Sequence, residues 1–105
     1  MRVAIASTGN SLESTISHHF GRCDYFVIYD TESKAIEYIP NPRKDAEEGA
    51  GQSAVQLVAS RNVQKIISGD FGIKIKPLLD SLRIQMIVIK DNKKKINDII
   101  EMLNH

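Results

Sequence analysis

The order of its apolar and amphipathic segments constrains the fold of this chain more than any other feature. Five short apolar runs, which predict buried strands, cover residues 3–6, 25–29, 35–39, 65–68 and 85–89. Three stretches with apolar residues at helical spacing predict helices over residues 51–61, 75–82 and 96–103. Asp91 or Asn92 is expected to cap the last helix. The predicted order is therefore three strands, a helix, a strand, a helix, a strand and a helix.

The connections between these elements predict how the strands pair. The polar link over residues 30–34 is short enough for a hairpin, so the second and third strands should be antiparallel. Helices connect the later strands, and such crossovers make neighbouring strands parallel. The sequence therefore predicts an α/β fold with a mixed five-stranded sheet of order 3-2-1-4-5. In this sheet the second strand is antiparallel to the rest, and helices cover both faces.

Length and composition indicate one domain over residues 1–105. A chain of this length, with 42% hydrophobic and 26% charged residues, can bury an ordinary core without disulfides. The formal net charge of +1 gives no indication of binding to nucleic acid or to a membrane surface, and no segment reaches membrane-spanning length. The single cysteine excludes an intrachain disulfide and fits a reducing compartment. We expect a cytoplasmic protein.

The segment from His18 to Cys23 carries the most distinctive chemistry of the sequence. It places two imidazoles, the only thiol and the Arg22 guanidinium within six residues, just before the apolar run 25–29. Imidazole and thiolate are ligands for iron and other soft metals, so His18, His19 and Cys23 are candidate metal ligands. Arg22 is a candidate partner for an anionic metal cluster. The alternative interpretation is a surface loop with two exposed histidines and a half-buried cysteine.

The predicted topology gathers several loops at the carboxyl ends of the parallel strands. These loops cover residues 8–24, 40–50, 69–72 and 90–93. Open α/β sheets bind ligands at this edge, and the first two helices should begin there with free N–H groups that favour anions. Four glycines in these loops are candidate ligand-binding positions: Gly49, Gly51, Gly69 and Gly72. The lysine and Ser/Thr of a P-loop are absent, and the alternative is a turn or helix entry that needs small residues.

Several short motifs match one known family. They are Val3-Ala4-Ile5-Ala6, His19-Phe20-Gly21-Arg22 before Tyr25-Phe26, Asn41-Pro42, Gly49-Ala50-Gly51 and Gly69-Asp70-Phe71-Gly72. On these motifs, which span nearly the whole chain, the sequence resembles the dinitrogenase iron–molybdenum cofactor biosynthesis family, small domains related to nitrogenase accessory proteins. The resemblance implies a ribonuclease-H-like α/β fold, which agrees with the predicted topology. It also implies binding rather than catalysis.

The resemblance implies a non-enzymatic carrier of an iron–sulfur or iron–molybdenum-type cluster or its precursor. Such a carrier takes part in metallocluster assembly and exchanges its cargo with donor and acceptor proteins. His19 is then a candidate cluster ligand, Arg22 offsets cluster charge, and His18 and Cys23 are further candidate ligands. Some relatives carry histidines just before the Gly-Ala-Gly stretch, where residues 46–48 of this chain are Ala-Glu-Glu. A second soft ligand from this loop is therefore missing.

Two other functions are alternatives, one that uses the same edge of the predicted sheet and one prompted by the fold alone. A metal-free module could bind a phosphate-bearing metabolite or nucleotide through residues 49–51, the Ser7-Thr8-Gly9 turn and Arg22. A nuclease needs carboxylates clustered on the central strands, and the first predicted strand offers none, which argues against this activity.

We expect a monomer, or a weak homodimer that pairs through the exposed edge of the third strand.

Overall fold

A computed structural model describes residues 1–104 and contains every predicted strand and helix. The strands are β1 (Arg2–Ser7), β2 (Tyr25–Asp30), β3 (Ile36–Pro40), β4 (Lys65–Ser68) and β5 (Gln85–Val88). The helices are α1 (Ala50–Ala59), α2 (Lys76–Ser81) and α3 (Ile96–Leu103). Where the ends differ from the predicted ones, they do so by about one or two residues, the usual scatter of helix and strand ends. No helix within residues 1–104 is long and apolar enough to cross a membrane.

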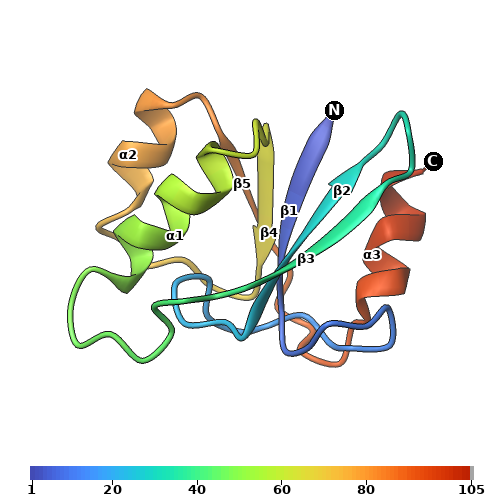
Figure 1. The fold of residues 1–105 in the computed structure, drawn as a ribbon, viewed down its shortest axis with the longest axis horizontal. Coiled ribbons are helices and arrows are strands. Elements are labelled where there is room, and N and C mark those ends of the chain that lie inside the picture. Colours follow the sequence, from blue (N-terminus) through green and yellow to red (C-terminus); the bar gives the residue numbers. More distant parts are fainter. Residues whose placement is uncertain (105) are drawn as a thin grey trace.

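The strands form one mixed sheet of order β3-β2-β1-β4-β5, as predicted (Figure 1). β2 is antiparallel to both of its neighbours, whereas β1, β4 and β5 are parallel to one another. The central strand β1 is buried from Val3 to Ser7. Its Ala4 lies between Ile28 of β2 and Ile66 of β4. The predicted α/β fold and its sheet order are therefore confirmed.

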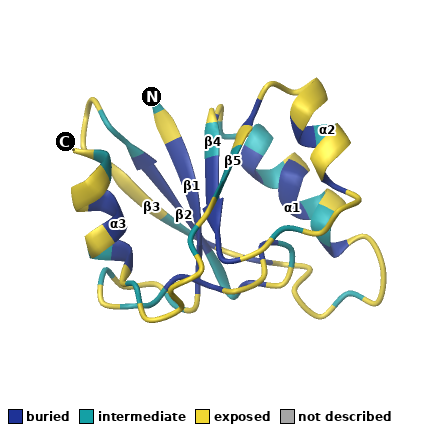
Figure 2. Cartoon of the chain, turned by 180° about the vertical axis from the view of Figure 1, so that it is seen from behind, coloured by how far each residue is buried: buried dark blue, intermediate teal, exposed yellow. Residues whose placement is uncertain are grey.

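Alternation of side chains along β1 divides the core into two layers. Ala4 and Ala6 face the layer under α1 and α2, whereas Val3 and Ile5 face the layer under α3. Figure 1 shows α1 and α2 on one side of the sheet and α3 on the other. In Figure 2 the buried residues concentrate on the central strands and on the parts of the helices that face them. Each helix is thus held by the apolar stripe that it buries against the sheet.

α3 begins at Ile96 as predicted, but the residue that caps it differs from the prediction. Lys95, rather than Asp91 or Asn92, precedes the helix, so the predicted cap is wrong. The first N–H group of the helix, on Ile96, donates to the carbonyl oxygen of Ser14 at 2.8 Å. The loop after β1 therefore satisfies a helix end that a local side chain was expected to cap. The N-terminus of α3 is therefore capped by a backbone contact between segments that are far apart in sequence.

Candidate functional site

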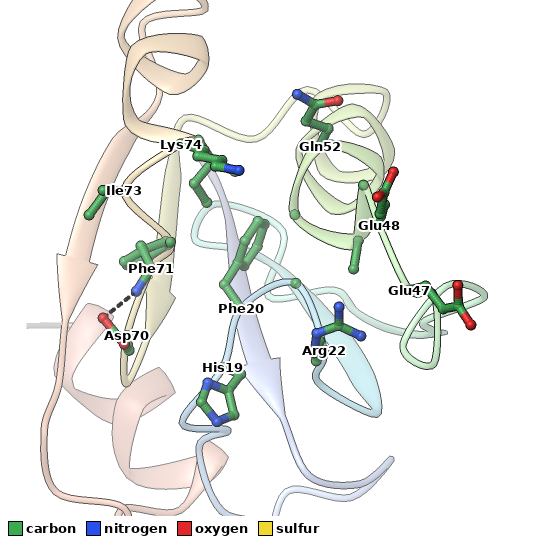
Figure 3. A pocket seen from close by; sticks show the side chains of 16 residues that line it. His19, Phe20, Arg22, Glu47, Glu48, Gln52, Asp70, Phe71, Ile73 and Lys74 are labelled. Atoms are coloured by element: carbon green, nitrogen blue, oxygen red, sulfur yellow. Dashed lines mark hydrogen bonds between the residues drawn. The ribbon is translucent and has the colours of Figure 1, made fainter.

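A pocket of about 910 Å³ opens at the predicted edge of the sheet (Figure 3). Its lining comes from three segments that are far apart in sequence, residues 19–22, 47–52 and 70–75. They are the loop before β2, the start of α1 and the loop before α2. The volume lies within the range of roughly 300–1,000 Å³ that small ligands and cofactors occupy. Three of the four loops expected at this edge line the pocket, and the loop over residues 90–93 does not.

Two glycines allow these three segments to approach one another. A methyl group at Gly21 would lie 2.8 Å from the Cα and N atoms of Gly51, so the loop before β2 packs directly on the first turn of α1. A methyl group at Gly51 would lie 2.9 Å from Cγ2 of Ile75, at the start of α2. Neither position has room for a side chain without a shift of its neighbours. Gly21 was part of a sequence motif but was not predicted as a site residue.

The other glycines predicted for the site have different roles. Gly49 precedes α1 with a φ of 76°, a left-handed conformation that favours glycine. Gly72 lines the pocket and has open space around it. Gly69 does not line the pocket, and its backbone packs on that of His18, because a methyl group at Gly69 would lie 2.8 Å from the His18 Cα. Gly69 therefore holds one loop against another.

The side chain of Asn41 anchors the loop before β2. Its Nδ2 donates to the carbonyl oxygens of Gly21 and Cys23, both at 3.0 Å. Its Oδ1 accepts a hydrogen bond from the Arg43 N–H at 3.1 Å. Asn41 is buried, so these bonds replace water on both ends of its amide. The residue thereby fixes the loop that carries the pocket residues 19–22.

Replacing Asn41 with alanine is expected to lower the free energy of unfolding by about 2 kcal/mol, because two backbone carbonyl groups lose their donor. Urea denaturation followed by circular dichroism measures this change. Asn92→Ala is the matched control, since Asn92 is exposed, and its expected effect is within about 0.5 kcal/mol. Equal losses in the two variants would contradict the anchoring role of Asn41.

The structure separates the three predicted metal ligands. His19 lines the pocket, whereas His18 is exposed outside it, and their rings meet edge to face with centroids 4.7 Å apart. Cys23 is 2% exposed and packs in the core layer under α1 and α2. Within the described chain, no three His, Cys, Asp or Glu side chains gather as a metal site. His18, His19 and Cys23 are thus neighbours in sequence without forming a three-ligand site.

Burial also changes the chemistry of the Cys23 thiol. Loss of hydration raises the pKa of Cys23 from 9.0 to about 12. Metals bind the thiolate rather than the thiol, and this pKa keeps Cys23 protonated at neutral pH. Cys23 therefore behaves as a small apolar core residue.

Charged side chains surround the pocket unevenly. Two cations and three carboxylates line it: Arg22, Lys74, Glu47, Glu48 and Asp70. Two positive and three negative charges give the lining a formal charge of −1 with His19 neutral. The Asp70 carboxylate accepts a hydrogen bond from the Phe71 N–H at 2.8 Å (Figure 3). The pocket is therefore not a uniformly basic site, and the position of each charge decides what it can bind.

The first turn of α1 presents free backbone N–H groups to the pocket. The first hydrogen bond of the helix runs from the Ser53 N–H to the Gly49 carbonyl oxygen at 3.0 Å. The N–H groups of residues 50–52 therefore have no partner within the helix, and these residues line the pocket. No side chain caps them, because glycine stands at the capping position. Anions are favoured at such a helix N-terminus.

Sequence reasoning found six of the pocket residues: His19, Arg22, Gly49, Gly51 and Gly72, and Ala50 for the metal-free module alone. The lining residues that it missed are Phe20, Gly21, Glu47, Glu48, Gln52, Asp70, Phe71, Ile73, Lys74 and Ile75. Some of these stand within the quoted motifs, which could have pointed to them. Lys74 stands in no motif, and no signal in the sequence singles it out.

Comparisons with known proteins agree with the fold and with the motifs. A family model described as dinitrogenase iron-molybdenum cofactor matches residues 1–105. An uncharacterized protein of Methanocaldococcus jannaschii is 31% identical over 105 residues, which cover 97% of this chain and 84% of the relative.

Two solved structures share the fold. The apo form of the orange protein from Desulfovibrio gigas has a TM-score of 0.88 at 25% identity, over 95% of this chain and 83% of that chain. A Thermotoga protein described as a candidate NifB protein has a TM-score of 0.80 at 31% identity, over 95% of this chain and 84% of its own.

Proposed function

This chain belongs to the dinitrogenase iron-molybdenum cofactor family, and we propose that it is a non-enzymatic carrier of an iron–sulfur or iron–molybdenum-type cluster or its precursor. One observation carries the proposal. Motif residues from three separate segments, among them His19, Arg22 and Gly51, line one pocket of about 910 Å³. The cluster would occupy this pocket as cargo.

His19 is the cluster ligand in this proposal. Among the residues that line the pocket it supplies the single imidazole, and none of them supplies a thiol. Imidazole is a suitable ligand for iron. Cys23 lies in the core and His18 lies outside the pocket, so neither is included. The free N–H groups of residues 50–52 would offset the negative charge of a cluster.

A site with one soft ligand suits transient binding. Resident iron–sulfur clusters are held by several cysteine or histidine ligands, whereas a carrier must release its cargo. The pocket offers His19 and a set of hydrogen-bond donors and charges, which support capture without a permanent attachment. The partners of such a carrier are a cluster donor and a cluster acceptor, and we expect the exchange to take place in the cytoplasm.

An anaerobic titration of the apo-protein with a preformed iron–sulfur cluster, and with isolated iron–molybdenum cofactor, tests this proposal. We expect saturable binding in visible absorption and co-elution of cluster and protein on gel filtration. His19→Ala should weaken binding at least about tenfold, because it removes the coordinating side chain. His18→Ala should stay within about threefold of the wild type, because His18 does not line the pocket.

Equal losses in the two histidine variants, or no loss in either, would refute His19 as the ligand. Circular dichroism spectra of both variants show whether they remain folded, so a loss of binding is not confused with unfolding. Absence of binding to either cluster would refute the carrier function.

A second candidate function is a metal-free module that binds a phosphate-bearing metabolite or nucleotide. The uncapped first turn of α1 at residues 50–52 favours it. The Ser7-Thr8-Gly9 turn does not contribute, because it does not line the pocket and the Ser7 hydroxyl donates to the Gly9 carbonyl oxygen at 2.6 Å. A thermal-shift screen with nucleotides and phosphorylated metabolites, under metal-free conditions, separates the candidates. Stabilisation by such a ligand without cluster binding would favour the module.

A further inference from the structure

The two cations of the pocket have different surroundings, and we infer that Lys74 pairs with an anionic ligand whereas Arg22 positions the loop before α1. The inference deepens the proposed function and rests on it, because it names the charge of the cargo and the residue that selects it. The resemblance of the sequence to its family implied the opposite assignment, in which Arg22 offsets the charge of the cluster.

The Arg22 guanidinium is directed at the protein backbone. Its Nη1 donates to the carbonyl oxygen of Ala46 at 2.6 Å and to that of Lys44 at 3.2 Å. Asp24 holds the same loop through an ion pair of its Oδ1 with Lys44 Nζ at 2.6 Å. Figure 3 shows the guanidinium reaching from the loop before β2 toward the segment that carries Glu47. Arg22 therefore holds one wall of the pocket in place through hydrogen bonds to the backbone, and these bonds form without any ligand.

Lys74 enters the pocket from the opposite wall. It lies in the loop before α2, and its ammonium forms no ion pair with any residue of the described chain. In Figure 3 its side chain extends toward α1, where residues 50–52 present their free N–H groups. An anion between these two elements would have an ammonium group on one side and helix N–H groups on the other. Both interactions favour negative charge at the same place.

Two glutamates decide which anions the pocket accepts. Glu47 and Glu48 lie at the end of the loop that Arg22 holds, and neither forms a hydrogen bond or an ion pair through its side chain within residues 1–104. They repel negative charge on their side of the pocket. The favoured ligand is therefore an anion that concentrates its charge on one side, facing Lys74.

Charge-neutral variants of the full chain test this inference with two probes, a preformed iron–sulfur cluster and inorganic phosphate. Lys74→Gln should weaken the binding of each probe about fivefold at low salt and should reduce the salt dependence of binding. Lys76→Gln is the matched control and should bind like the wild type, because Lys76 lies outside the pocket and pairs with Asp80 at 3.0 Å. Glu48→Gln should strengthen binding about threefold.

The positioning role of Arg22 is tested without any ligand. Arg22→Gln should accelerate amide hydrogen exchange in residues 44–48 at least about tenfold, read at the Ala46 N–H, which donates to the Arg43 carbonyl oxygen at 3.1 Å. The reason is that the carbonyl groups of Lys44 and Ala46 both lose the Arg22 Nη1 donor that holds the loop. Lys74→Gln should leave exchange in the same residues unchanged. This readout separates the positioning of a loop from the pairing of a charge.

The inference is overturned if Lys74→Gln and Lys76→Gln bind both probes alike, or if Arg22→Gln removes the salt dependence and leaves exchange unchanged. Failure of the cluster to bind, together with a phosphate response that depends on Lys74, would refute the proposed function and support the assignment of Lys74. Absence of binding by both probes in every variant would overturn both.

Discussion

Replacing Gly21 with alanine is expected to lower the free energy of unfolding by about 3 kcal/mol and the melting temperature by about 15 °C. The reason is the direct contact of two backbone segments. A methyl group at Gly21 would lie 2.8 Å from the Cα and N atoms of Gly51 and 3.2 Å from the carbonyl carbon of Ala50. A helix backbone cannot move aside as the end of a side chain can. The loop before β2 must therefore separate from α1, and the pocket between them loses its shape.

Thermal and urea denaturation, both followed by circular dichroism, measure this effect. Gly72→Ala is the matched control, because no atom lies within 4 Å of a methyl group at that position. Its expected effect on the free energy of unfolding is within about 0.5 kcal/mol. If the two variants are equally stable, the loop before β2 does not pack on α1 as the structure has it, and the pocket must be described anew.

Raising the pH from 8 to about 10.5 is expected to destabilise the wild-type protein by about 2 kcal/mol more than a Cys23→Ala variant. Burial raises the pKa of Cys23 from 9.0 to about 12 in the folded state, whereas unfolding exposes the thiol to water. Below pH 9 both states keep the proton, and the stabilisation is complete. Between pH 9 and 12 the unfolded chain loses its proton first, so the free energy of unfolding falls by about 1.4 kcal/mol per pH unit.

Urea denaturation at a series of pH values, with reductant present, compares the two proteins. The variant lacks the thiol but shares every other titrating group, so the difference between the two pH profiles belongs to Cys23. Parallel profiles would show that the thiol is hydrated in the folded protein. In that case Cys23 would return to the set of candidate cluster ligands.

Most of the fold could be predicted because its signals are local. The apolar run at residues 25–29 and the short polar link at 30–34 are enough to predict the hairpin of β2 and β3. The contact that caps the N-terminus of α3 could not be predicted in the same way. The carbonyl oxygen of Ser14 accepts a hydrogen bond from the Ile96 N–H, the first of this helix. Four strands and two helices lie between these two residues in the sequence.

The location of the site could also be predicted, but its composition only in part. Connectivity decides which loops meet at one edge of the sheet, so His19 and Gly51 could be assigned to a common site before any contact was known. The anchoring contact of Asn41 with the loop before β2 could not be assigned, because a side chain that bonds backbone carbonyl groups leaves no periodic pattern.

The sequence by itself determined the order of the elements, the order of the strands and the edge where the pocket lies, because hydrophobic periodicity and connection length belong to single segments. Only the tertiary structure decided where each side chain of the site lies. His19 lines the pocket and Cys23 lies in the core, although four positions separate them. In the tertiary structure the Arg22 guanidinium donates hydrogen bonds to backbone carbonyl oxygens, whereas Lys74 forms no ion pair within the described residues. These outcomes depend on contacts between distant segments, and no local pattern encodes the geometry of such contacts.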